Sequence, residues 1–281
     1  EGIGLFRTEF LFMDRGFAPS EEEQFESYKK AALIMKNKPV IIRTLDVGGD
    51  KNISYLKMPK EENPFLGFRA VRYCLKNRDL YRAQLRALLR ASVYGDIRIM
   101  VPLVSSLEEL IGVKKLIEEL KRELKRDGVP FDKNIKVGVM IETPAAAAIA
   151  DLLAKEADFF SIGTNDLTQY MIAVDRGNPD VAYLYSTFHP AVLRAIKYVI
   201  KCAKDERIPV GMCGEAAADR KLVPVWISFG LDEFSVNPAS VLTTRKEIAC
   251  WTKKAADEIT NLAMSKNTAE EVEEALSVKR Q

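Results

Sequence analysis

The stretch "VGVMIETPAAAAIADLLAKEADFFSIG", residues 137–163, decides the fold class. It opens and closes with short, unbroken apolar runs, VGVMI (137–141) and FFSIG (159–163). Runs of this kind are typical of parallel strands that are buried on both faces. Between the two runs, Thr143 and Pro144 supply a helix N-cap and a proline for the first helical turn. The stretch therefore predicts a strand, a helix and a second, parallel strand.

The same alternation continues along the whole chain. Further apolar runs lie at residues 2–6, 39–42, 97–104, 209–212 and 233–236. Amphipathic segments separate them, and three of these begin with capping boxes, Ser20 with Glu23, Ser106 with Glu109 and Thr268 with Glu271. A long helix is expected from Pro190 to about residue 206, and the region 239–281 is helical in pattern. Repeated strand–helix units over 281 residues predict an α/β protein, a (β/α)8 TIM barrel rather than a doubly wound sheet.

The count of strands is one short of a barrel. Seven runs are found where eight strands are needed. The missing strand is expected upstream of residue 1, with ISYLKM (53–58) as an internal alternative. Because no Ser/Gly-rich linker interrupts the chain, we expect residues 1–281 to form a single domain.

Composition narrows the class of protein. The chain carries 42 Lys and Arg against 40 Asp and Glu, which gives no signature of a nucleic-acid partner. No apolar run approaches the roughly 20 residues that span a bilayer, so no membrane partner is expected. Four scattered cysteines form neither a CxxC pair nor a disulfide framework, which favours a reducing, cytoplasmic location. The single histidine, His189, excludes zinc sites built from several histidines, and its position before Pro190 is that of a helix start.

Polar side chains stand at the carboxyl ends of the predicted strands, where the catalytic face of a barrel lies. They are Arg7, Arg43, Glu142, Asn165, Asp166, Cys213, Glu215 and Asn237. Arginine forks match the oxygens of phosphate and carboxylate groups. Glu142 and Asp166 follow consecutive strands, and a pair of carboxylates suits Mg²⁺. The set predicts a site for a small ligand that carries both a phosphate and a carboxylate.

Each of these residues also has a structural explanation. Arg7 and Arg43 are of a kind that forms ordinary ion pairs, and Glu142 stands where a helix N-terminus favours negative charge. Asn165 and Asp166 are common turn residues. Cys213 alone is more typical of a small buried hydrophobic residue. The functional interpretation depends on all of them sharing one kind of position.

Six longer strings indicate a family. They are GIGLFRTEFLFMDR (2–15), RTLDVGGDK (43–51), NPFLGFRAVR (63–72), VGVMIETPAA (137–146), SIGTNDLTQYMIAVDRGN (161–178) and GMCGEAA (211–217). Together they resemble the phosphoenolpyruvate-utilising enzyme family. The string RTLDVGGDK resembles the enzyme I branch, from the bacterial sugar phosphotransferase system, more than the dikinases or phosphoenolpyruvate (PEP) synthases.

The resemblance implies a barrel that binds PEP and Mg²⁺, passes the phosphoryl group to a histidine on a separate N-terminal domain, and releases pyruvate. It implies substrate contacts for Arg7, Arg43, Arg69, Asn165 and Arg176, with Arg69 the weakest candidate. It also implies that Glu142 and Asp166 bind the metal and that Cys213 protonates the enolate. A thiol suits this last role because its usual pKa of about 8.5 keeps it protonated at neutral pH.

The resemblance also predicts partners. It implies a homodimer formed through this domain and, through the N-terminal domain, a small phosphocarrier protein. The family's phosphohistidine motif, of the GGxxSH type, is absent from the sequence, and His189 lies in a different context. The acceptor histidine is therefore expected outside this chain. Two alternatives remain open: the PEP domain of a pyruvate phosphate dikinase or PEP synthase, and a PEP-sensing dimerisation module without catalysis.

Overall fold

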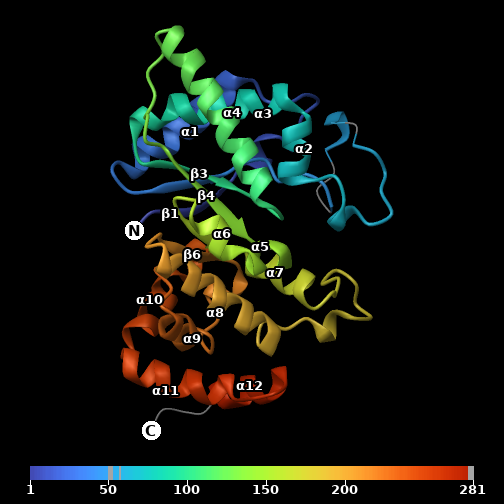
Figure 1. The fold of residues 1–281 in the computed structure, drawn as a ribbon, viewed down its shortest axis with the longest axis vertical. Helices are drawn as coiled ribbons and strands as arrows, with labels where there is room; N and C mark the ends of the chain where they lie inside the picture. The colour runs from blue at the N-terminus through green and yellow to red at the C-terminus, as the bar shows by residue number, and fades with distance from the viewer. Residues whose placement is uncertain (50–52, 57, 278–281) are drawn as a thin grey trace. The chain divides into compact units, whose positions relative to one another are not determined.

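The computed structural model describes residues 1–49, 53–56 and 58–277 (Figure 1). The chain divides into two compact units. The first comprises Glu1–Met140 and Glu156–Asp158, and the second Ile141–Lys155 and Phe159–Gln281. That residues 1–281 form a single domain remains a prediction.

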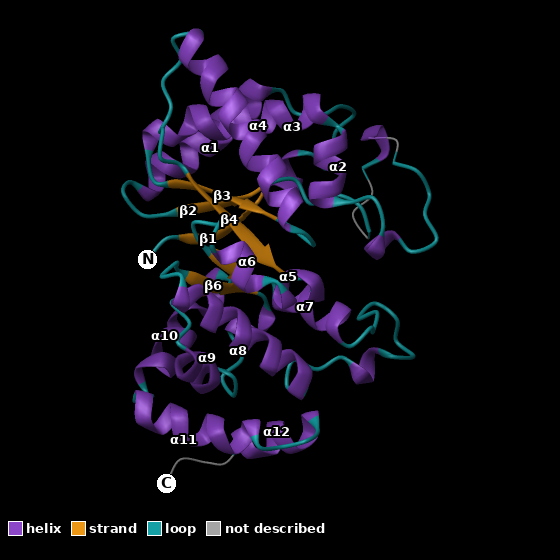
Figure 2. Cartoon of the chain, in the orientation of Figure 1, coloured by secondary structure: helices purple, strands orange, loops and turns teal. Residues whose placement is uncertain are grey.

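The first unit is built on parallel strands, β1 (Ile3–Arg7), β2 (Val40–Arg43), β3 (Ile97–Val101) and β4 (Lys136–Ile141), whose last residue belongs to the second unit. Its helices are α1 (Glu21–Met35), α2 (Ala70–Lys76), α3 (Arg78–Ala91) and α4 (Leu107–Arg126). Figure 2 shows α1, α3 and α4 along one side of these strands. The three apolar residues of β2, Val40–Ile42, are buried, as the apolar run predicted, and Arg43 at its end is buried as well.

The second unit contains the parallel strands β5 (Phe160–Ile162), β6 (Val210–Cys213) and β7 (Glu233–Ser235). Its helices are α5 (Pro144–Ala148), α6 (Ala150–Ala154), α7 (Thr164–Met171), α8 (Pro190–Asp205), α9 (Val223–Phe229), α10 (Val241–Ala249), α11 (Lys253–Met264) and α12 (Ala269–Leu276). The Gly163 N–H donates to the Ile141 carbonyl at 3.1 Å, so the end of β5 lies beside the last residue of β4. Along the chain, parallel strands alternate with helices as in a TIM-barrel-like α/β fold, which confirms the predicted fold class.

The predicted helix starts are confirmed. Ser20, Ser106 and Thr268 each complete a capping box with the glutamate three residues later. The Thr143 hydroxyl accepts from the Ala146 N–H at 3.0 Å, and Pro144 follows in the first turn of α5. These contacts satisfy backbone donors that the helix itself leaves without partners. The described part of the region after residue 239 is helical, also as predicted.

Two apolar segments differ from their predicted strands. In ISYLKM, residues Ser54–Leu56 form a 3-10 turn, because the Leu56 N–H donates to the Ile53 carbonyl at 3.0 Å; Lys57 lies outside the described residues. The internal strand proposed at 53–58 is therefore wrong for the part that the structure describes. The run 97–104 stops being a strand at Val101, because Pro102 lacks a donor and Leu103 has a positive φ of 53°.

Among the described residues, no helix combines the length and the apolar character that crossing a bilayer requires.

Candidate functional site

Two arginines stand side by side at the ends of β1 and β2. Arg7 and Arg43 are partners in the parallel register of these strands. The Arg7 side chain is exposed and makes no hydrogen bond or ion pair with any residue in the described part of the chain. Arg7 is therefore a cation available to an anionic ligand.

Arg43, in contrast, is buried and paired. Its Nη2 contacts a carboxylate oxygen of Glu9 and lies 3.1 Å from Oδ2 of Asp46. Its Nη1 lies 3.7 Å from the sulfur of Met140. Both carboxylates are themselves buried, so removing the guanidinium would leave two charges without their counter-ion. These pairs hold the Arg43 guanidinium in one orientation within the first unit.

Arg69 joins the same group of charges. This residue precedes α2, is buried, and its Nη2 lies 2.9 Å from Oδ1 of Asp46. Asp46 thus bridges Arg43 and Arg69 with one oxygen to each. The first glycine of the RTLDVGGDK string, Gly48, is required by its surroundings. Its φ is +106°, and a Cβ there would lie 2.5 Å from the Arg69 Cβ. The backbone before residue 50 therefore packs closely against Arg69.

Sequence reasoning missed the two acids of this group, Glu9 and Asp46. A local signal was present, because Glu9 lies two residues after Arg7 and Asp46 three residues after Arg43. Each acid follows a strand-end arginine within one of the recognised strings. What the sequence did not show is that Glu9 pairs with Arg43, 34 residues away, rather than with its neighbour Arg7.

The predicted metal carboxylates belong to the second unit. Glu142 directly follows Ile141 and is 2% exposed, and Asp166 lies in the first turn of α7. The Gly163–Ile141 hydrogen bond brings the segments before these two residues together. Asp166 Oδ1 also lies 3.1 Å from Nη2 of Arg176, whose side chain is 36% exposed. Arg176 thus lies close enough to Asp166 to neutralise its charge.

The donor chemistry of this pair fits Mg²⁺. Carboxylate oxygens are hard ligands, and Mg²⁺ in proteins typically takes one or two of them and completes its shell with water and substrate oxygens. In the part of the chain that the structure describes, no three His, Cys, Asp or Glu side chains gather into a group that could hold a metal ion. The carboxylates of Glu142 and Asp166 are two oxygen ligands of the kind that Mg²⁺ takes.

Asn165 connects two elements of the second unit. Its Oδ1 accepts from the Glu215 N–H at 3.1 Å, in the 3-10 turn Glu215–Ala217 after β6. Its backbone carbonyl accepts from the Tyr185 hydroxyl, also at 3.1 Å. Burial raises the pKa of Tyr185, so this hydroxyl stays a donor. Tyr185 is a supporting residue that no pattern in the sequence indicated.

Cys213 is the last residue of β6 and is 8% exposed. The Ser161 hydroxyl of β5 donates to its sulfur at 3.1 Å. Sequence reasoning did not single out Ser161, although it is the polar residue in the run FFSIG. The thiol at the end of β6 therefore has a neighbouring hydrogen-bond donor.

Gly214, next to Cys213, has no room for a side chain. A Cβ at this position would lie 2.0 Å from Oγ1 of Thr164 and 3.0 Å from its backbone nitrogen. The φ of Gly214 is −174°, which any residue adopts, so proximity rather than backbone conformation requires glycine here. The glycine after the cysteine allows the start of α7 to approach the end of β6.

We expect Gly214→Ala to lower the free energy of unfolding by about 1–3 kcal/mol, because a methyl group has to displace Thr164. Urea denaturation of the purified chain measures the change. Gly16→Ala is the matched control, because a Cβ at Gly16 meets no heavy atom within 4 Å. Equal stability of the two variants would contradict the close approach.

His189 has the role that its position predicted. It is the N-cap residue of α8, and its Nδ1 accepts from the Ala191 N–H at 3.1 Å. The imidazole thus replaces the capping hydroxyl found at other helix starts. This contact confirms the interpretation of His189 as a helix-start residue.

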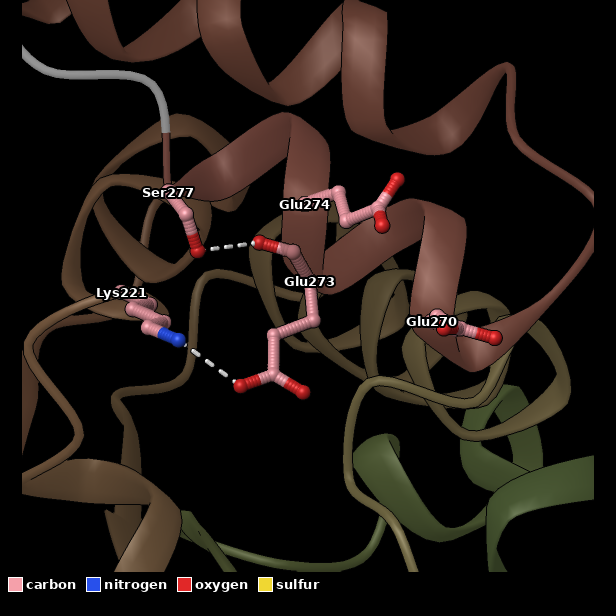
Figure 3. Close-up of a pocket in the computed structure, with 5 residues that line it drawn as sticks. All are labelled: Lys221, Glu270, Glu273, Glu274 and Ser277. Atoms are coloured by element: carbon pink, nitrogen blue, oxygen red, sulfur yellow. Dashed lines mark hydrogen bonds and ion pairs between the residues drawn. The ribbon is translucent and has the colours of Figure 1, made fainter.

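A shallow hollow in the second unit lies among other residues. Its volume is about 500 Å³, and it is lined by Lys221, Glu270, Glu273, Glu274 and Ser277 (Figure 3). The Lys221 ammonium pairs with Glu273 at 2.8 Å, and the Ser277 hydroxyl donates to the Glu273 carbonyl at 2.7 Å. Three carboxylates around one lysine repel an anionic ligand. None of the predicted site residues lines this hollow.

Comparison with known families gives an extensive match. Residues 1–252 match the family described as PEP-utilising enzyme, PEP-binding domain.

Curated proteins named phosphoenolpyruvate-protein phosphotransferase are similar to nearly the whole chain. The one from Geobacillus stearothermophilus is 53% identical over 272 residues, 97% of this chain and 47% of its own length. Those from Priestia megaterium and Staphylococcus epidermidis are 51% and 50% identical, each over 97% of this chain and 48% of their own length. The chain thus spans about half the length of these relatives.

Proposed function

The chain belongs to the PEP-utilising enzyme family through its PEP-binding domain, and on that premise we propose that it binds PEP together with Mg²⁺. It acts as the part of a phosphoenolpyruvate-protein phosphotransferase in which the phosphoryl group leaves PEP. The acceptor is a histidine on a separate N-terminal domain, and the product is pyruvate. The observation that supports this proposal is 53% identity, over 97% of the chain, to a protein of that name.

The arginines are proposed to bind the phosphate. Arg7 offers an exposed guanidinium beside Arg43, and Arg43 and Arg69 are held in fixed orientations by Asp46. Arg176 adds a further, partly exposed cation. Oriented cations of this kind stabilise the charge of a transferring phosphoryl group, which is most of what catalysis of this transfer requires. Asn165 completes the substrate contacts with its amide group.

Glu142 and Asp166 are proposed to hold the Mg²⁺. When bound, the ion would neutralise negative charge on the phosphate and on the enolate. Residues of the chain supply charge balance and the proton. Arg176 balances the charge of Asp166, and Cys213 holds the proton that the enolate needs. As the phosphorus–oxygen bond breaks, the phosphoryl group passes to the histidine, and the S–H proton of Cys213 moves to C3 to give pyruvate.

We further propose that this transfer is the first step of phosphotransferase sugar uptake and that it takes place in the cytoplasm. The partners are a second copy of this domain, the N-terminal histidine domain and, through that domain, a small phosphocarrier protein. Relatives twice as long as this chain support the requirement for a further domain.

Calorimetric titration of the purified chain with PEP, with and without Mg²⁺, tests the proposal. We expect saturable binding with Mg²⁺ and much weaker binding after the metal is removed, since substrate oxygens complete the metal's shell. Sulfate at the same ionic strength is the control for binding of an anion by the arginines alone. Absence of PEP binding at millimolar Mg²⁺ would refute the proposed function.

Arg43→Lys should weaken PEP binding even though the charge is kept. The three N–H groups of a lysine share one nitrogen, so they cannot span Glu9, Asp46 and a phosphate as the planar guanidinium fork can. Loss of a hydrogen bond between charged groups weakens binding by about ten- to a hundredfold. Calorimetry measures the affinity. The control is Arg78→Lys, at an exposed arginine paired with Glu119. Unchanged PEP affinity with lowered thermal stability would make Arg43 purely structural.

A further inference from the structure

The hydroxyl of Ser161 is placed against the thiol that the proposed reaction uses as its acid. Ser161 Oγ lies 3.1 Å from Cys213 Sγ and donates to it. Ser161 is 3% exposed and lies in the middle of β5, with buried residues on either side. Burial in such a strand removes the hydration of a polar side chain. The loss costs little free energy only when the side chain forms a hydrogen bond within the protein. The partner that it finds is the sulfur of Cys213.

The register of the sheet produces this contact. Ser161 is the partner of Gly211 in the parallel pairing of β5 with β6. Cys213 lies two residues beyond Gly211, so its side chain points to the same face of the sheet as that of Ser161. Position 211 has no side chain, so β6 places nothing on this face between the hydroxyl and the thiol. A shift of the register by one residue would move Ser161 to the other face.

The direction of the hydrogen bond has a chemical consequence. Because the hydroxyl donates, the sulfur is the acceptor, and the S–H proton is left for another acceptor. After that proton leaves, the sulfur is negatively charged and the same hydrogen bond becomes charge-assisted, and therefore stronger. An interaction that strengthens along the reaction lowers the barrier, whereas one of constant strength does not.

We propose that Ser161 is a positioning residue for Cys213, one that orients the thiol and stabilises the thiolate left when the proton is delivered. This inference rests on the proposed function, in which Cys213 protonates the enolate of pyruvate. In that step the S–H bond breaks, a C3–H bond forms from the electron pair of the enolate, and the negative charge moves to sulfur. The hydroxyl of Ser161 gives up no proton and only strengthens its hydrogen bond.

Alkylation of the thiols tests the pairing on this chain alone, without PEP. Iodoacetamide reacts with a thiolate, which forms an S–C bond and releases iodide, so the rate reports how much thiolate is present. The rate at each cysteine is read by mass spectrometry of its peptide. Cys250, which is exposed and on α10's C-terminal side, is an internal reference in the same sample.

Ser161→Ala should make alkylation of Cys213 about three- to tenfold slower, since a hydrogen bond to the charged form is lost and the higher intrinsic reactivity of the thiolate compensates only in part. The rate at Cys250 should not change. If Ser161 only fills space, the alkylation rate of Cys213 should rise instead, because a smaller side chain opens space beside Cys213 and exposes it. A rate at Cys213 that is unchanged or higher overturns the proposal.

Two matched variants separate the effect of the hydroxyl from the effect of side-chain shape. Ser161→Thr and Ser161→Val have nearly the same shape and differ in the hydroxyl, and both suit a strand. Only the threonine should keep the rate of Cys213 near that of the parent, which also covers the case in which the alanine variant does not fold. Ser235→Ala is a further control, since Ser235 pairs with Cys213 on the opposite neighbouring strand, and its hydroxyl makes no hydrogen bond in the described part of the structure. Equal rates for the threonine and valine variants would overturn the proposal.

Turnover distinguishes this inference from the proposed function. In the full-length phosphotransferase that contains this domain, Ser161→Ala should lower kcat for pyruvate formation about three- to tenfold and leave KM for PEP unchanged. If the parent forms no pyruvate from PEP, the proposed function fails, and the alkylation result still decides whether Ser161 controls the thiol. A rise in KM with unchanged kcat would assign Ser161 to substrate binding and overturn its role as a positioning residue.

Discussion

Cys213→Ala should leave PEP bound and nearly stop its conversion to pyruvate. The substitution touches neither the arginines nor the carboxylates, so substrate affinity stays close to that of the parent. The enolate, however, loses its proton donor, and a positioned acid contributes about 10²–10⁴-fold to a rate. Pyruvate formation in the presence of the N-terminal histidine domain and the phosphocarrier measures the loss. Calorimetry on the same variant checks that PEP still binds.

Controls for this experiment come from the same unit. Cys202 in α8 is buried as Cys213 is, and Cys202→Ala should cost a similar small amount of stability, on the order of 1 kcal/mol, with no effect on turnover. Cys213→Ser should restore little activity, because a hydroxyl is a far weaker acid than a thiol. Pyruvate formation at the parent's rate in both Cys213 variants would show that this residue only fills space.

Glu142→Gln and Asp166→Asn should each abolish the Mg²⁺ dependence of PEP binding. Both substitutions keep the shape of the side chain and remove one charged oxygen ligand. Mutations of residues that only support a metal ligand cost about 10–100-fold in affinity, so loss of a direct ligand should weaken Mg²⁺-dependent PEP binding by more than about 100-fold. Titrations of PEP at fixed Mg²⁺, and of Mg²⁺ at fixed PEP, measure how strongly each ligand depends on the other for binding.

The comparison without metal makes this test specific. In the presence of a chelator, Glu142→Gln and the parent should bind PEP equally weakly, because the carboxylate acts only through the ion. Asp205→Asn removes an exposed carboxylate that pairs with Lys201, and it should bind as the parent does. Asp166→Asn also breaks the pair with Arg176, so Glu142→Gln is the cleaner of the two. Full Mg²⁺ dependence in both variants would remove the metal assignment.

The comparison of sequence with structure separates local from distant determinants. The strands of the described residues and the capped helix starts were predictable because each depends on residues within a few positions of one another. A capping box places its serine or threonine three residues before its glutamate, and a buried strand shows as an unbroken apolar run. The internal alternative at ISYLKM was wrong for its described part, where the apolar residues belong to a 3-10 turn whose hydrogen bond closes within the segment.

The sequence by itself determined which chemical groups stand at the strand ends, because strand ends and polar residues can both be read along the chain. Only the tertiary structure decided which of these groups meet. Arg43 pairs with Glu9 across 34 positions, and Ser161 reaches Cys213 across 52. The first contact depends on how the 3-10 turn Thr8–Leu11 after β1 packs against the end of β2. The second depends on the register between β5 and β6, and a shift of one residue would turn Ser161 to the opposite face. No local pattern carries that information, because register results from the packing of the whole sheet.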